Sequence, residues 1–78
     1  MKYKITLEDK GQDFLEFTVD NNIIVDTQPF QGNIWNGAYI PVEEMVKIGK
    51  PCPIHHPPHI YCGELKYNVV NLEKLNNG

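Results

Sequence analysis

The sequence predicts a mostly β single domain over residues 1–78, folded as a small antiparallel barrel or curled sheet of SH3-like or OB-like size. Short segments of alternating apolar and polar residues recur along the chain, and turn-forming residues separate them. A length of 78 residues leaves room for one compact unit. One short helix near residues 41–47 fits the same outline.

The first two segments predict a β-hairpin. In residues 2–8, Tyr3, Ile5 and Leu7 alternate with polar residues, which is the two-residue period of a half-buried strand. Residues 14–20 alternate in the same way. The intervening residues 9–12 contain Asp and Gly, which favour a tight turn between the two strands.

A third strand is expected to complete a meander. Asn21 and Asn22 tolerate positive φ and predict a second turn. The following residues 23–30 begin with three β-branched side chains, which are poor helix formers. After a Gly- and Asn-rich interruption, residues 38–40 can form a short strand.

The middle of the chain is expected to be irregular. Pro41 can begin a helix of one or two turns, and Gly49 would stop it. Residues 49–63 hold four of the six prolines, so they cannot form a regular central strand or helix. They are interpreted as a long, stiff hairpin loop.

The last segment, residues 64–75, predicts a closing strand. Its apolar residues alternate as far as Val69 and then shift phase to Val70 and Leu72, as a bulged or sharply bent strand would. A C-terminal helix over residues 68–75 is the alternative, since three- and four-residue spacings are also present.

Composition and charge exclude several functions. A net charge of −3 and the absence of arginine remove the basic surface and the planar guanidinium groups on which nucleic-acid binding depends, so no nucleic acid is expected as a partner. The absence of serine excludes Ser-His-Asp catalysis. No complete catalytic constellation is found, and a non-enzymatic protein is predicted.

The chain lacks the features of membrane proteins. No apolar run approaches the roughly 18 residues that a membrane span needs, and the N-terminus has no signal-peptide core. A cytoplasmic location is therefore expected, with no membrane partner. Cysteines in that compartment stay reduced.

Cysteine and histidine cluster in the proline-rich segment. The spacing of Cys52, His55, His59 and Cys62 suggests a Cys₂His₂ zinc site, because thiolate and imidazole are preferred zinc ligands. Rigid prolines argue against a standard zinc knuckle, so the alternative is a proline-stiffened loop with exposed histidines and two incidental cysteines. A Cys-His nucleophilic dyad is a further alternative, although so small a fold seldom frames the cleft it needs.

An aromatic cluster is the candidate partner-binding site. Tryptophan and tyrosine dominate the hot spots of protein interfaces, and large apolar residues gather in and beside the Gly- and Asn-rich segment. The candidate residues are Phe30, Ile34, Trp35 and Tyr39. The alternative is that Trp35 closes the open end of the barrel as part of the core.

The usage of residues is typical of an AT-rich coding sequence: Asn, Ile and Lys are frequent, and arginine is absent. The chain opens with KYKITLEDKGQDFLEFTVD and continues later with DTQPFQGNIWNG. In these segments it resembles small open reading frames of Bacteroides-type bacteria and their phages. The resemblance covers about the first half of the chain and implies an accessory or phage-encoded protein, without implying any functional residue.

Together these observations predict a small binding or accessory protein that acts through protein–protein contacts. The expected partner is another protein, including a second copy of the chain as a homo-oligomer. One alternative is a phage-type inhibitor that blocks a host enzyme or sequesters a small nucleotide signal. Another is a small zinc-binding module.

Overall fold

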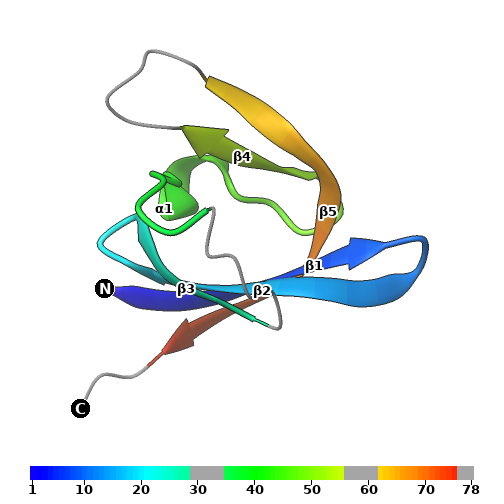
Figure 1. The fold of residues 1–78 in the computed structure, drawn as a ribbon, viewed down its shortest axis with the longest axis horizontal. Helices are drawn as coiled ribbons and strands as arrows, with labels where there is room; N and C mark the ends of the chain where they lie inside the picture. Colours follow the sequence, from blue (N-terminus) through cyan, green and yellow to red (C-terminus); the bar gives the residue numbers. More distant parts are fainter. Residues whose placement is uncertain (29–34, 56–61, 76–78) are drawn as a thin grey trace.

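The chain forms one five-stranded antiparallel sheet with strand order β3-β2-β1-β5-β4 (Figure 1). The computed structural model describes residues 1–28, 35–55 and 62–75, with the side chains of Asp13, Phe14 and Cys62 outside that description. The elements are β1 (Lys2–Asp9), β2 (Gln12–Asp20), β3 (Ile23–Gln28), α1 (Val42–Met45), β4 (Pro51–His55) and β5 (Cys62–Leu75). The predicted mostly β class, with a curled sheet and one short helix, is confirmed.

The meander of β1, β2 and β3 has the two predicted tight turns. Lys10 and Gly11 have φ values of 53° and 82°, and Asn21 and Asn22 have φ values of 52° and 68°. Positive φ at both central residues is the signature of the type I′ turn, whose twist matches that of the flanking strands. Asparagine and glycine adopt this conformation readily, whereas lysine does so at a cost.

The strain at Lys10 predicts a stabilising substitution. We expect Lys10→Asn to raise the free energy of unfolding by about 0.5 to 1 kcal/mol, because asparagine adopts positive φ more easily. Urea unfolding checks this as a higher midpoint at an unchanged slope. Lys47→Asn removes the same charge at an exposed position without positive φ and is the matched control. An equal shift in both variants would assign the effect to charge and contradict the turn argument.

The closing strand β5 is long and bent, and its two halves pair with different neighbours (Figure 1). Thr6 lies opposite Asn71 and Leu7 lies opposite Val69, so Val70 is an extra residue on β5. This bulge lies where the apolar alternation of the sequence shifts phase, and the predicted bulged strand is confirmed. The alternative of a C-terminal helix is wrong.

The proline-rich segment corrects the expectation of an irregular loop throughout residues 49–63. Residues 51–55 form β4, which pairs with β5 as a hairpin. Pro51 and Pro53 are tolerated because β4 is the last strand in the sheet order, so its missing N–H groups interrupt no central ladder. The predicted hairpin around the proline loop is confirmed, with more of it in strand conformation than expected.

Within the described residues, Tyr39 joins the two edges of the sheet. Tyr39 forms one antiparallel bridge with Ile23 of β3 and another with His55 of β4. Because β3 and β4 are the two outer strands, these bridges turn the curled sheet back on itself. Residues 37–40 form backbone hydrogen bonds with β4 on one side, and with β3 and the β2–β3 turn on the other. We call residues 37–40, together with these hydrogen bonds, the seam. The short strand expected at residues 38–40 is reduced to this one bridge residue.

The helix α1 follows the seam directly and is shorter than the residues 41–47 expected for it. Asn22 holds its start, since the Asn22 side-chain oxygen accepts a hydrogen bond from the Val42 backbone N–H at 3.2 Å. Pro41 is the N-cap residue, and the chain returns to an extended conformation at Val46, before Gly49. Across the described ranges, no helix has the length and apolar character needed to cross a bilayer.

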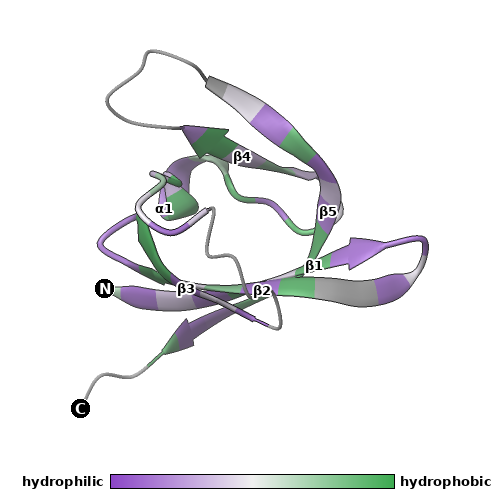
Figure 2. Ribbon diagram, in the orientation of Figure 1, coloured by the Kyte–Doolittle hydropathy of each residue, from purple (hydrophilic) through white to green (hydrophobic). Residues whose placement is uncertain are grey.

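The core lies on the concave side of the sheet, beneath the seam and α1. Residues from every strand and from the seam contribute, and hydrophobic and hydrophilic positions alternate along β5 (Figure 2). The largest fully buried side chains are Phe17, Ile5, Leu7, Ile24, Ile40, Val19, Val42, Val69, Thr27 and Cys52. The faces assigned to β1 and β2 by alternation are therefore the ones that are buried.

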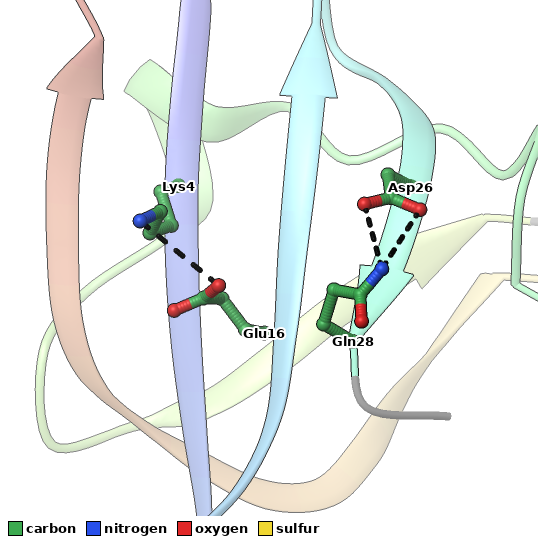
Figure 3. Close-up of polar contacts among 4 residues, drawn as sticks. All are labelled: Lys4, Glu16, Asp26 and Gln28. Atoms are coloured by element: carbon green, nitrogen blue, oxygen red, sulfur yellow. Dashed lines mark hydrogen bonds and ion pairs between the residues drawn. The ribbon is translucent and has the colours of Figure 1, made fainter. Parts of the chain in front are cut away.

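The opposite face of the meander is polar. Lys4 of β1 lies 4.0 Å from Glu16 of β2, and the Gln28 side chain donates to the Asp26 carboxylate on β3 (Figure 3). These contacts are partly exposed, so they contribute little to stability. The outer surface over β1, β2 and the last residues of β3 is therefore hydrophilic, whereas Ile23 and Val25 lie earlier on β3.

Candidate partner-binding site

The candidate site lies on the outside of the seam. Tyr39 donates its N–H to the His55 carbonyl and accepts a hydrogen bond from the His55 N–H, both at 2.9 Å. Its neighbours in the chain, Ala38 and Ile40, are buried in the core. Since successive residues of an extended segment point to opposite faces, the Tyr39 side chain lies on the outer face.

Residues that pair directly across antiparallel strands have side chains on the same face. Ile23 and His55, the two bridge partners of Tyr39, therefore accompany it on the outside, and Val25 is exposed two residues further along β3. We call these four residues the seam surface. Val25 is 49% exposed and Tyr39 is 36% exposed, and the Tyr39 ring meets the His55 ring edge to face at 5.6 Å.

The backbone of the seam is held on both sides of Tyr39. Ile24 donates to the Ala38 carbonyl at 2.9 Å, and Ile40 donates to the Asn22 carbonyl at 2.7 Å. With the two bonds to His55, these contacts fix the position from which the Tyr39 side chain projects. The ring is thus both accessible and restrained.

The preceding turn supports the seam from within. Trp35 is partly buried against the core, and its ring meets the buried ring of Phe17 at a centroid distance of 5.9 Å and an interplanar angle of 60°. This is the edge arrangement that aromatic pairs prefer. Of the four predicted partner-binding residues, the structure places Tyr39 on the surface and packs Trp35 against the core. Phe30 and Ile34 lie outside the described residues.

A buried hydroxyl anchors the same turn to β3. The Thr27 hydroxyl donates to the Asn36 side-chain oxygen at 3.0 Å, and the Asn36 amide donates to the Val25 carbonyl at 3.4 Å. Thr27 is 1% exposed, so this hydrogen bond satisfies a polar group that would otherwise be costly to bury. The sequence alone did not indicate this contact, because no local pattern connects Thr27 with Asn36, nine positions later.

A second polar contact holds α1 against β1. The Tyr3 hydroxyl donates to the Glu43 carboxylate at 2.8 Å. That hydrogen bond, burial and the nearby negative charge raise the pKa of Tyr3. The neutral phenol is therefore the form that the folded protein favours. Its contribution to stability is fully present below the pH at which a free tyrosine ionises, and it is lost as the pH rises from there through the raised pKa of Tyr3.

The four predicted zinc ligands are placed unequally. Cys52 is a free, fully buried thiol on the core face of β4, whereas His55, three residues later, lies on the outer face. Cys62 pairs with His55 through the backbone, its side chain is outside the description, and His59 lies outside the described residues. No group of three metal-ligating side chains occurs within the described part of the chain. The zinc hypothesis stays a prediction, which elemental analysis of untagged protein tests.

The burial of Cys52 predicts an unreactive thiol. Desolvation raises its pKa to about 12, and the thiolate is the reactive form. In a Cys62→Ala variant, we expect the remaining thiol to react with a disulfide reagent at neutral pH roughly a hundredfold more slowly in the folded protein than in urea. Absorbance of the released thiolate measures both rates. Equal rates would show that Cys52 is accessible.

Three residues of the seam surface, Ile23, Val25 and His55, were not predicted from the sequence as partner-binding residues, and His55 was predicted only as a zinc ligand. Alternation with buried Ile24 and Ile54 places the side chains of Ile23 and His55 on the outer face once the strands are known. Val25 is the extra residue at a register shift between β2 and β3, and its exposure follows only from the structure. No family model matches this chain, and no curated protein or solved structure is significantly similar to it. Its function is therefore inferred from its own residues.

Proposed function

We propose that this protein is a small binding or accessory protein that acts through protein–protein contacts at the seam surface. The observation that carries the proposal is the position of Tyr39. Its ring is accessible, while its backbone is hydrogen-bonded to β4 and lies between two further bonds to the β2–β3 side of the sheet. A large aromatic side chain whose backbone is held in place by hydrogen bonds is suited to anchor an interface.

Restraint of this kind favours binding because association costs the entropy of ordering the groups that meet. Tyr39 has little backbone freedom left to lose, and the edge contact with His55 restricts its ring further. Ile23, which pairs with Tyr39, and the exposed Val25 add apolar area on the outer side of β3. The seam surface thus combines an aromatic anchor with an apolar surround.

The outer face of β1 and β2 differs in chemistry from the seam surface. The outer face of β1, β2 and the last residues of β3 carries charged and amide side chains that contact one another in pairs (Figure 3). Burial of that face would require desolvation of those groups, whereas burial of the seam surface would remove mainly apolar area from water. A protein partner is therefore expected to contact the seam surface.

The test compares two double variants with the wild type as immobilised bait. Val25→Asp with Tyr39→Ser changes the seam surface, and Ile48→Asp with Met45→Ser introduces the same two residue types at two other exposed apolar positions. Bound proteins are quantified by mass spectrometry, and light scattering of each purified protein reports self-association. Melting curves establish that both variants remain folded.

We expect a protein, or self-association, that is retained by the wild type and by the Met45/Ile48 variant and is lost from the Val25/Tyr39 variant. Loss of self-association would identify a second copy as the partner, and loss of one captured protein would identify a different one. Binding unaffected by the seam variant, or no specific binding at all, would contradict the proposal.

A further inference from the structure

The turn that leads into the seam contains an asparagine followed by a glycine, Asn36 and Gly37. We propose that Asn36 is a deamidation site, and that closure of the seam protects it. Asn36 is exposed to solvent, and Gly37 has no side chain to hinder approach to its backbone nitrogen. Deamidation of Asn36 does not depend on the proposed binding function, since it changes the covalent structure of the seam itself.

The reaction requires only water. The Gly37 backbone nitrogen attacks the Asn36 side-chain carbonyl carbon, a C–N bond forms, and the side-chain nitrogen leaves as ammonia. Water then opens the resulting succinimide ring at either carbonyl. The products are aspartate, or isoaspartate in which the main chain runs through the former side chain. Each event consumes one water, releases one ammonia and converts a neutral amide into a carboxylate.

In the closed seam, the attacking backbone nitrogen of Gly37 is already engaged in a hydrogen bond. The Gly37 N–H donates to the Ile24 carbonyl at 2.8 Å, within the row of hydrogen bonds that continues to Tyr39. Attack by this nitrogen requires loss of its proton and release from that bond. The nitrogen also lies in a turn closed by a hydrogen bond from Ala38 to the Trp35 carbonyl at 3.1 Å, and Gly37 adopts φ of 91° there.

The closed seam also holds the electrophile. The Asn36 side-chain oxygen accepts from the buried Thr27 hydroxyl at 3.0 Å, and its nitrogen donates to the Val25 carbonyl at 3.4 Å. Both partners belong to β3, so the amide is bound to the strand and is not free to rotate toward Gly37. Reaction therefore requires local opening of the turn, which makes its rate depend on the fraction of open molecules.

Deamidation at position 36 is expected to weaken the hydrogen bonds of the seam. A carboxylate at position 36 cannot donate to the Val25 carbonyl, and its negative charge lies beside that carbonyl oxygen. Isoaspartate also lengthens the main chain between Trp35 and Gly37, which displaces the Gly37 bond to Ile24. Because the reaction is irreversible in water, each opening that ends in deamidation favours further opening.

The experiment measures deamidation at Asn36 by peptide mass spectrometry during incubation at mildly alkaline pH, for the folded protein and for the protein in urea. We expect the folded rate to be roughly tenfold or more below the rate in urea, since the closed state does not react. Asn22, which precedes the β-branched Ile23, serves as a slow internal reference in urea.

Two matched variants separate the structural effect from the chemistry. Thr27→Val removes the hydroxyl that holds Asn36 and should raise the folded rate several-fold while leaving the rate in urea unchanged. Thr18→Val makes the same substitution on β2, at a residue that pairs with Asp26 and has no hydrogen bond to Asn36 among the described contacts, and should change neither rate. Gly37→Ala should slow the reaction in urea, where backbone strain plays no part, because a methyl group hinders the attacking nitrogen.

A fourth variant, Asn36→Asp, represents one product and should speed amide hydrogen exchange at Ile24 and Ile40. Equal rates of Asn36 deamidation in the folded protein and in urea would overturn the proposed protection. A folded Thr27→Val variant that deamidates at the wild-type rate would overturn it as well. No deamidation at Asn36 in urea would overturn the assignment of the site. Unchanged exchange in Asn36→Asp would overturn the expected effect on the seam.

Discussion

Phe17→Ala is expected to leave the protein largely unfolded in dilute buffer at room temperature. Phe17 is fully buried, lies between Ile5 of β1 and Thr27 of β3 in the sheet, and contacts the edge of Trp35. Truncation of a buried phenylalanine costs about 3 to 5 kcal/mol. A core of this size nets about the same amount, so no stability margin remains.

Far-ultraviolet circular dichroism and urea titration check this prediction. Val25→Ala is the control, because a half-exposed side chain on the outer face should change the free energy of unfolding by no more than about 0.5 kcal/mol. A cooperative urea transition for Phe17→Ala within about 1 kcal/mol of the wild type would show that the side chain is not in a packed core.

Tyr39→Pro is expected to open the seam at a cost of about 2 to 4 kcal/mol in the free energy of unfolding. Proline has no N–H to donate to the His55 carbonyl, and its φ is fixed near −65°, far from the about −140° of an antiparallel strand. The two edge strands β3 and β4 would then lose the residue that joins them.

Amide hydrogen exchange shows whether the loss is local. In Tyr39→Pro we expect faster exchange at Ile24, Ile40 and His55, whose N–H groups bond within the seam. Tyr39→Thr keeps both backbone bonds and favours extended structure, so it should cost about 1 kcal/mol or less and leave exchange at these sites slow. If Tyr39→Pro and Tyr39→Thr changed stability and hydrogen exchange equally, the backbone hydrogen bonds of residue 39 would not be what keeps the seam closed.

Much of the sheet could be predicted because local sequence and tertiary structure agree there. Tyr3, Ile5 and Leu7 alternate with polar residues and are buried, and the Asn21–Asn22 turn has the positive φ that asparagine permits. The phase shift near Val70 predicted a bulge, because an extra residue reverses which face the following side chains take.

Other features were determined only by the tertiary structure. Pro51 and Pro53 predicted a loop, and they lie in a strand because β4 occupies an edge where their missing N–H groups interrupt no central ladder. Cys52 belonged to a predicted ligand set, and the direction in which β4 faces the core made it a buried thiol with a raised pKa.

The pairing of the seam with the two edge strands could not be predicted from local sequence patterns. The sequence determined that residues 38–40 could be extended, that Tyr39 was a large aromatic group and that Gly37 favoured a turn. It could not determine that Tyr39 pairs with Ile23 on one side and His55 on the other, since these contacts join residues 16 positions apart along the chain. Such pairings depend on how far the whole sheet curls, and the sum of strand twist, bulges and core packing sets that curvature, not any single segment.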